Sequence, residues 1–93
     1  MTMLAYHAHF FKTDDGWYVV EVPDFPGVCS QGKTLRSARV MIRDALKLMA
    51  ECAVDEGEAL PRPNAKAKPS MGKKADLVEV IPLKTRFLTP AVK

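Results

Sequence analysis

The chain has 93 residues and a mass of 10.3 kDa, which suffices for one small domain and excludes a large self-contained enzyme. Hydrophobic residues make up 47% and charged residues 27%, as in ordinary globular proteins, and no apolar run reaches the roughly 18 residues of a membrane span. The net charge of +3 hides an asymmetry. Residues 1–58 have six basic and nine acidic side chains, whereas residues 59–93 have eight basic and two acidic ones. The overall charge therefore does not by itself indicate a nucleic-acid-binding protein.

Three strands are predicted in the first third of the chain. Residues 4–12 and 17–22 alternate in polarity and are rich in aromatic and β-branched side chains, and the Asp-Gly pair between them is a strong hairpin signal. Residues 23–27 contain two prolines, which have no backbone donor, and therefore form a rigid connection rather than a paired strand. Residues 28–31 follow as a short third strand.

A long helix is predicted after Thr34, whose hydroxyl can cap its first turn. The helix presents one apolar stripe at three- and four-residue spacing over about five turns, formed by Leu35, Ala38, Ile42, Ala45, Leu46, Met49, Cys52 and Ala53. Its opposite side carries a basic stripe formed by Arg36, Arg39, Arg43 and Lys47. Gly57 is expected to end the helix.

The remainder of the chain is predicted to add one strand. Residues 57–75 are rich in proline and lysine, and we expect an exposed basic linker that does not pack tightly. Residues 76–81 alternate again and should join the same sheet. The resulting order, β-β-β-α-β, predicts an α+β fold in which a three- to four-stranded sheet carries one long helix on one face. Residues 1–83 form this domain, and residues 84–93 form a short tail.

No catalytic or cofactor-binding motif stands out. Cys29 and Cys52 have no metal-binding spacing and are predicted to be buried free thiols. His7 and His9 point to one side of a predicted strand, but no third ligand completes a metal site. We therefore expect neither a metal nor another cofactor. No secretory signal is evident, so we predict a cytoplasmic protein without membrane contacts, and its small core favours a homo-oligomer.

Two alternative functions remain open from the residues alone. The first is a vestigial or active metal-dependent nuclease, whose magnesium ions would be held by clustered carboxylates such as Asp14, Asp15, Glu21 and Asp24. The second is a nucleic-acid-binding module that uses the basic helix stripe and the lysines of the linker. Aromatic side chains for base stacking are not interleaved with these charges, so a solvated helix face is the simpler interpretation.

One stretch, residues 16–38 (GWYVVEVPDFPGVCSQGKTLRSA), resembles the HicB-like antitoxins. Their hallmark is a strand followed by Pro-Asp-aromatic-or-aliphatic-Pro-Gly, then Gly-x-Thr and a long helix. The positions that carry the resemblance here are Pro23, Asp24, Pro26, Gly27, Gly32, Thr34 and Ala38. The resemblance spans residues 4–64 and includes the Pro-x-Pro pair after the helix.

The resemblance implies a pared-down ribonuclease H-like domain that is not an enzyme. It further implies a HicA-type toxin as partner, a small basic protein that cleaves messenger RNA and that the antitoxin neutralises by covering its active site. The acidic part of the chain suits such a partner. We expect the partner surface to comprise the exposed acids and the rim of the 23–27 connection, namely Asp14, Asp15, Glu21, Asp24 and Phe25.

The sequence departs from the family pattern in two ways. Relatives often have acidic residues at the positions of Lys33, Arg36 and Ser37, where this chain is basic or neutral. Many relatives also add a C-terminal DNA-binding module, whereas only twelve residues follow Ile81 here. We therefore do not expect this chain to bind DNA directly, and an orphan member of the family is a further interpretation.

Overall fold

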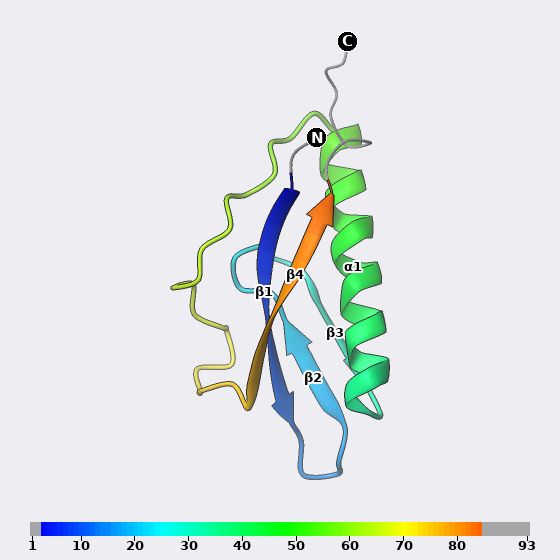
Figure 1. Cartoon of the computed structure of the whole chain (residues 1–93), viewed down its shortest axis with the longest axis vertical. Helices are drawn as coiled ribbons and strands as arrows, with labels where there is room; N and C mark the ends of the chain where they lie inside the picture. The colour runs from blue at the N-terminus through cyan, green and yellow to red at the C-terminus, as the bar shows by residue number, and fades with distance from the viewer. Residues whose placement is uncertain (1–2, 85–93) are drawn as a thin grey trace.

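The computed structural model describes residues 3–84. The elements are β1 (Met3–Lys12), β2 (Tyr18–Glu21), β3 (Cys29–Gly32), α1 (Leu35–Asp55) and β4 (Leu77–Lys84). The strands form one antiparallel sheet in the order β3-β2-β1-β4, and α1 packs across one face of it (Figure 1). The predicted α+β fold is confirmed, with four strands. The last nine residues of the expected tail lie outside the described residues.

The core lies between the sheet and α1. Alternate residues of β1 face the helix, and the register places Phe10 beside Val20 of β2 and Tyr6 beside Ile81 of β4. The helix contributes a stripe of fully buried residues, Ala38, Ile42, Leu46 and Ala50. Full burial of each large aliphatic side chain stabilises the fold by about 1.5–3 kcal/mol, so this layer is the main source of stability.

The first turn of α1 is fixed by local chemistry. Thr34 accepts a hydrogen bond from the backbone N–H of Ser37 at 3.0 Å, and the Ser37 hydroxyl accepts one from the Thr34 N–H, which completes a capping box. Gly32 permits β3 to approach this turn, because a Cβ atom there would lie 2.5 Å from the Ala38 backbone nitrogen. The family positions Gly32, Thr34 and Ala38 are therefore explained by the packing of β3 against the helix.

The connection between α1 and β4 was expected to be a free linker, but it lies along the face of the sheet away from α1 (Figure 1). The Tyr6 hydroxyl donates to the carbonyl oxygen of Pro61 at 2.6 Å, and the Asp76 N–H donates to that of Phe10 at 2.9 Å. Phe11, on this outer face, is fully buried, with the Lys73 ammonium 5.9 Å from its ring centroid. Most of residues 57–75 are exposed, as expected, but the contacts of this segment with the sheet were not predicted, because Leu60 and Met71 are its only large apolar side chains.

Both cysteines are free but exposed, so the prediction of buried thiols is wrong. The buried residues of α1 are spaced four apart and end at Ala50. Met49 and Cys52 therefore lie on the flank of the helix and not on its buried face. Cys29 lies on β3, the short edge strand, where one side of the backbone has no neighbouring strand.

Candidate partner-binding site

The turn between β1 and β2 presents two of the predicted partner residues. Asp14 and Asp15 are both exposed at this turn, where Gly16 adopts a positive φ of 88°. The Asp15 carboxylate accepts hydrogen bonds from the Thr13 hydroxyl and from the backbone N–H of Trp17. These bonds, the Thr13 bond first, lower the pKa of Asp15. Asp15 thus shapes the turn as well as carrying an exposed charge.

Glu21 lies on the outer face of the sheet and is half-buried. Its two carboxylate oxygens accept from the backbone N–H of Ser70 at 3.1 and 3.0 Å, and the Ser70 hydroxyl donates to one of them at 3.1 Å. Glu21 therefore anchors the α1–β4 connection to the sheet. Its carboxylate is occupied by an internal contact.

Asp24 is buried, contrary to the expectation that it is an exposed acid. One carboxylate oxygen accepts from the His7 backbone N–H at 3.1 Å. The other lies 2.7 Å from His7 Nδ1 and accepts from the Asn64 backbone N–H at 3.0 Å. Asp24 therefore joins three segments, the β2–β3 connection, β1 and the start of the α1–β4 connection, and this role explains its place in the family motif.

The charge of Asp24 affects the pKa of two neighbouring residues, Tyr6 and His9. Burial, and secondly the charge of Asp24, raises the pKa of Tyr6 to about 12. Burial lowers the pKa of His9, although Asp24 opposes this shift. His7 and His9 are both half-buried. Across residues 3–84 no three His, Cys, Asp or Glu side chains are grouped so that they could hold a metal ion.

Phe25 is also buried, so its expected place on the rim is wrong. Its ring packs against that of Tyr6, with centroids 5.2 Å apart and planes tilted by 56°. The exposed part of the connection is formed by Pro26 and Gly27, and Gly27 has a φ of 93°, which favours glycine. The five predicted partner residues therefore do not form one surface. Asp14 and Asp15 lie at the β1–β2 turn, away from the β2–β3 connection (Figure 1).

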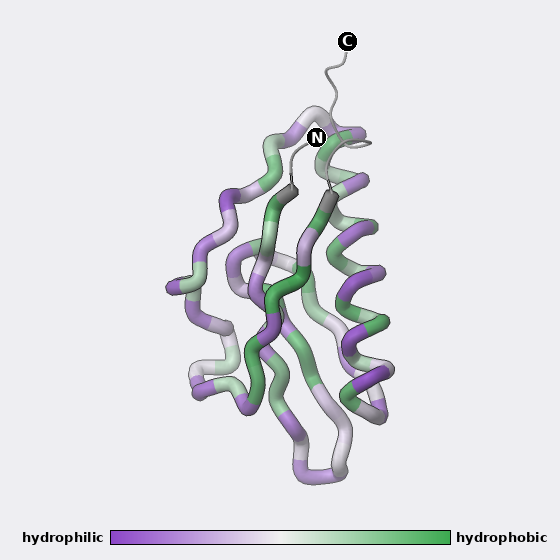
Figure 2. Tube along the Cα trace, viewed as in Figure 1, coloured by the Kyte–Doolittle hydropathy of each residue, from purple (hydrophilic) through white to green (hydrophobic). Residues whose placement is uncertain are grey.

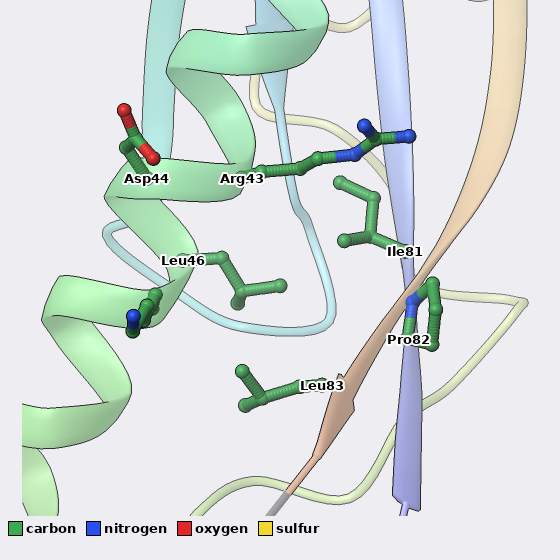
Figure 3. Close-up of a pocket in the computed structure, with 7 residues that line it drawn as sticks. Arg43, Asp44, Leu46, Ile81, Pro82 and Leu83 are labelled. Atoms are coloured by element: carbon green, nitrogen blue, oxygen red, sulfur yellow. The ribbon is translucent and has the colours of Figure 1, made fainter.

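The basic stripe of α1 faces β4. Arg39 binds Glu79 through three hydrogen bonds of 2.6–3.1 Å, and this guanidinium lowers the pKa of Glu79. Arg43 extends over a groove of about 360 Å³ between α1 and β4, into which Leu46 and Ile81 project (Figure 3). One member of the stripe is thus neutralised by β4, which weakens the case for a continuous phosphate-binding surface.

Two of the three positions that depart from the family pattern make structural contacts at the start of α1. Ser37 belongs to the capping box, and the Lys33 ammonium lies 5.6 Å from the ring centroid of Trp17. Arg36 is exposed in the first turn. None of them adds a carboxylate to this end of the helix.

Met41 and Leu48, two exposed apolar residues of α1, were not among the predicted site residues. The available signal was their place in a second series, residues 41, 45, 48 and 52, whose spacing of four, three and four is typical of a helix that packs against another surface. No helix among residues 3–84 is long and apolar enough to cross a membrane.

Comparison with known proteins identifies relatives of the whole domain. The family model described as "HicB_like antitoxin of bacterial toxin-antitoxin system" matches residues 6–83. The UPF0150 protein Ta0767 of Thermoplasma acidophilum is 39% identical over 62 residues, which cover 67% of this chain and 90% of that protein. An uncharacterized 14.9 kDa protein of Haemophilus phage HP1 is 42% identical over 53 residues, covering 57% of this chain and 39% of the phage protein.

Solved structures show the same fold. The N-terminal domain of the Burkholderia pseudomallei antitoxin HicB is 28% identical, with a TM-score of 0.68 over 84% of this chain and 95% of that domain. A toxin–antitoxin complex from Streptococcus pneumoniae contains a chain that is 20% identical, with a TM-score of 0.69 over 89% of this chain and 70% of that one, a likeness of fold alone. The family match covers most of the chain, and the protein therefore belongs to the HicB-like antitoxins of bacterial toxin–antitoxin systems.

Proposed function

We propose that this protein is an antitoxin that binds a small HicA-type, mRNA-cleaving toxin and neutralises it by covering the toxin's active site. The match of the family model over residues 6–83 carries this proposal. The likeness to the N-terminal domain of an antitoxin, which this chain covers almost completely, supports it. The action is stoichiometric binding, and no residue of the chain is assigned a catalytic role.

Residues 3–84 carry 12 basic and 11 acidic side chains, so the attraction of a basic partner depends on local acidic surface and not on the net charge of the domain. Exposed carboxylates of residues 1–58 would attract such a protein over a distance of about one Debye length and speed the encounter. Asp14 and Asp15 are exposed and therefore available for this attraction, whereas the Asp24 carboxylate is satisfied internally. Charge of this kind mainly sets the association rate and the choice of partner.

The proposal also includes self-association, because a core of this size gains stability from additional buried surface. It does not include direct DNA binding. The chain spans 61% of a longer structure of the Burkholderia pseudomallei antitoxin HicB.

Co-expression with the small basic reading frame next to its gene tests the proposed function. The expected result is that the neighbouring protein arrests growth by itself and that this chain restores growth and co-purifies with it. Arrest that persists in the presence of this chain, with no co-purification, would overturn the proposal.

A further inference from the structure

Helix α1 carries a second row of apolar residues, most of which are exposed within residues 3–84. We call it the outer stripe, and it consists of Met41, Ala45, Leu48 and Cys52. Met41 is 47% and Leu48 61% exposed. Ala45 borders the core, whereas Met41, Leu48 and Cys52 are exposed. Apolar segments recur along α1 in Figure 2. A large apolar side chain left this exposed, next to others in a row, is a feature of interaction surfaces.

The outer stripe continues into the family motif of the β2–β3 connection. Met49, 37% exposed, lies beside the stripe, and its Cε atom would be 3.4 Å from a Cβ built on Gly27. Pro26 and Gly27 are the exposed residues of that connection. One surface therefore runs from the middle of α1 across Met49 to the Pro-Gly turn.

The rim of the outer stripe is acidic. Three carboxylates, Asp44, Glu51 and Asp55, each lie three residues after a member of the stripe, and side chains at this spacing are neighbours on a helix. The arginines of α1 lie on the other flank, where Arg39 reaches Glu79 of β4. The helix thus carries its arginines toward β4 and the outer stripe on the other side, with Asp44 and Lys47 lying between the two.

The stability of the helix itself does not account for this distribution. The first turn contains no acidic residue and the last turn no basic one. The helix macrodipole favours the opposite arrangement, with acids near the N-terminus and bases near the C-terminus. Acidic residues such as Asp55 in the C-terminal half, and Arg36 at the start, therefore oppose the dipole, which points to a role outside the helix.

We propose that the outer stripe is the docking surface for a basic protein partner that inserts apolar side chains between Met41 and Leu48 and pairs its cations with Asp44 and Glu51. This inference deepens the proposed function, on which it rests, and names the toxin as the occupant. A second copy of the chain fits less well, because it would bring the same three carboxylates to the seam, where Lys47 is the one basic neighbour of Asp44 and Glu51 on α1.

A peptide probe tests the chemistry of the surface without the toxin. An amphipathic helical peptide of leucine and lysine is titrated into isotope-labelled protein, and a leucine–glutamate peptide of equal length is the control. We expect the Met41 and Met49 methyl signals and the amides around Leu48 to shift with the basic peptide only. Shifts confined to other elements, equal shifts with both peptides, or no shifts would overturn the proposal.

Substitutions in the chain test the same surface with the toxin. Leu48→Gln removes the most exposed apolar side chain, and Val40→Gln, on the arginine flank of the same helix and 51% exposed, is the matched control. Loss of a central apolar contact weakens binding by roughly tenfold, so Leu48→Gln should lose rescue and affinity while Val40→Gln keeps both. Equal behaviour of the two folded variants would overturn the proposal.

Two further measurements separate the outcomes. If the wild-type chain binds no toxin while the peptide result is positive, the proposed function fails and the surface assignment stands. Sedimentation that shows a dimer dissociated by Leu48→Gln would assign the stripe to a second copy. If shortening the chain to end at Lys84 shifts the methyl and amide signals of the outer stripe, the stripe would be assigned to the protein's own C-terminal residues. Either of these last two results contradicts docking of a basic partner.

Discussion

Asp24 and His7 form the central polar contact of the domain, with Nδ1 of the imidazole 2.7 Å from one carboxylate oxygen and the His7 backbone N–H 3.1 Å from the other. The Asp24 side chain is fully buried. The aspartate of the family motif is therefore a structural residue that ties the β2–β3 connection to β1.

Replacing Asp24 with alanine should destabilise the domain by about 1–3 kcal/mol, because it leaves the backbone N–H groups of His7 and Asn64 without their acceptor. Chemical denaturation measures this difference. Asp14→Ala at the exposed turn is the control and should change the free energy of unfolding by less than about 0.5 kcal/mol. Similar values for the two variants would contradict the structural role of Asp24.

Replacing Gly27 with valine should also destabilise the fold, because φ at this position is 93°. A β-branched residue in this region is strained by about 1–3 kcal/mol. Asparagine tolerates positive φ better than valine, so the melting temperature of Gly27→Asn should lie between those of the wild type and of Gly27→Val. If valine left the melting temperature unchanged, the backbone conformation described for this turn would be wrong.

The hydroxyl of Tyr6 should ionise only at unusually high pH, with a pKa of about 12. The neutral form is favoured in the folded state, so stability is retained below pH 10 and falls as the pH rises from the ordinary value toward 12. Titration of the protein followed by ultraviolet absorbance should show this ionisation at high pH, and the Tyr6→Phe substitution should remove it. The same variant loses the bond to the Pro61 carbonyl, at a cost of about 0.5–1.5 kcal/mol.

The ion pair between Arg39 and Glu79 should be visible as a lowered pKa of Glu79. A carboxylate with a depressed pKa adds stability that is present above its ordinary pKa and is lost as the pH falls through the depressed value. Carbon-detected titration of Glu79 should show this low midpoint, and Arg39→Gln should move it upward. An unchanged midpoint in that variant would show that Arg39 is not the cause.

Local signals were sufficient to predict much of this fold from the sequence. Gly16 marked the hairpin and Thr34 the start of α1, because turns and caps depend on residues close together in the chain. The burial of Asp24 depends on Asn64, 40 residues away, and no local pattern reveals such a partner. The outer stripe was assigned in part to the core, since Ala45 and Cys52 also continue the periodicity of the buried face.

The most direct test of the antitoxin role is an RNA-cleavage assay with the purified toxin encoded beside this protein. We expect cleavage to stop when the two proteins are present in equal amounts, and the Leu48→Gln variant to inhibit cleavage far less than the Val40→Gln variant. Full cleavage in the presence of a large excess of the wild-type chain would contradict the claim that this protein neutralises the toxin by binding it.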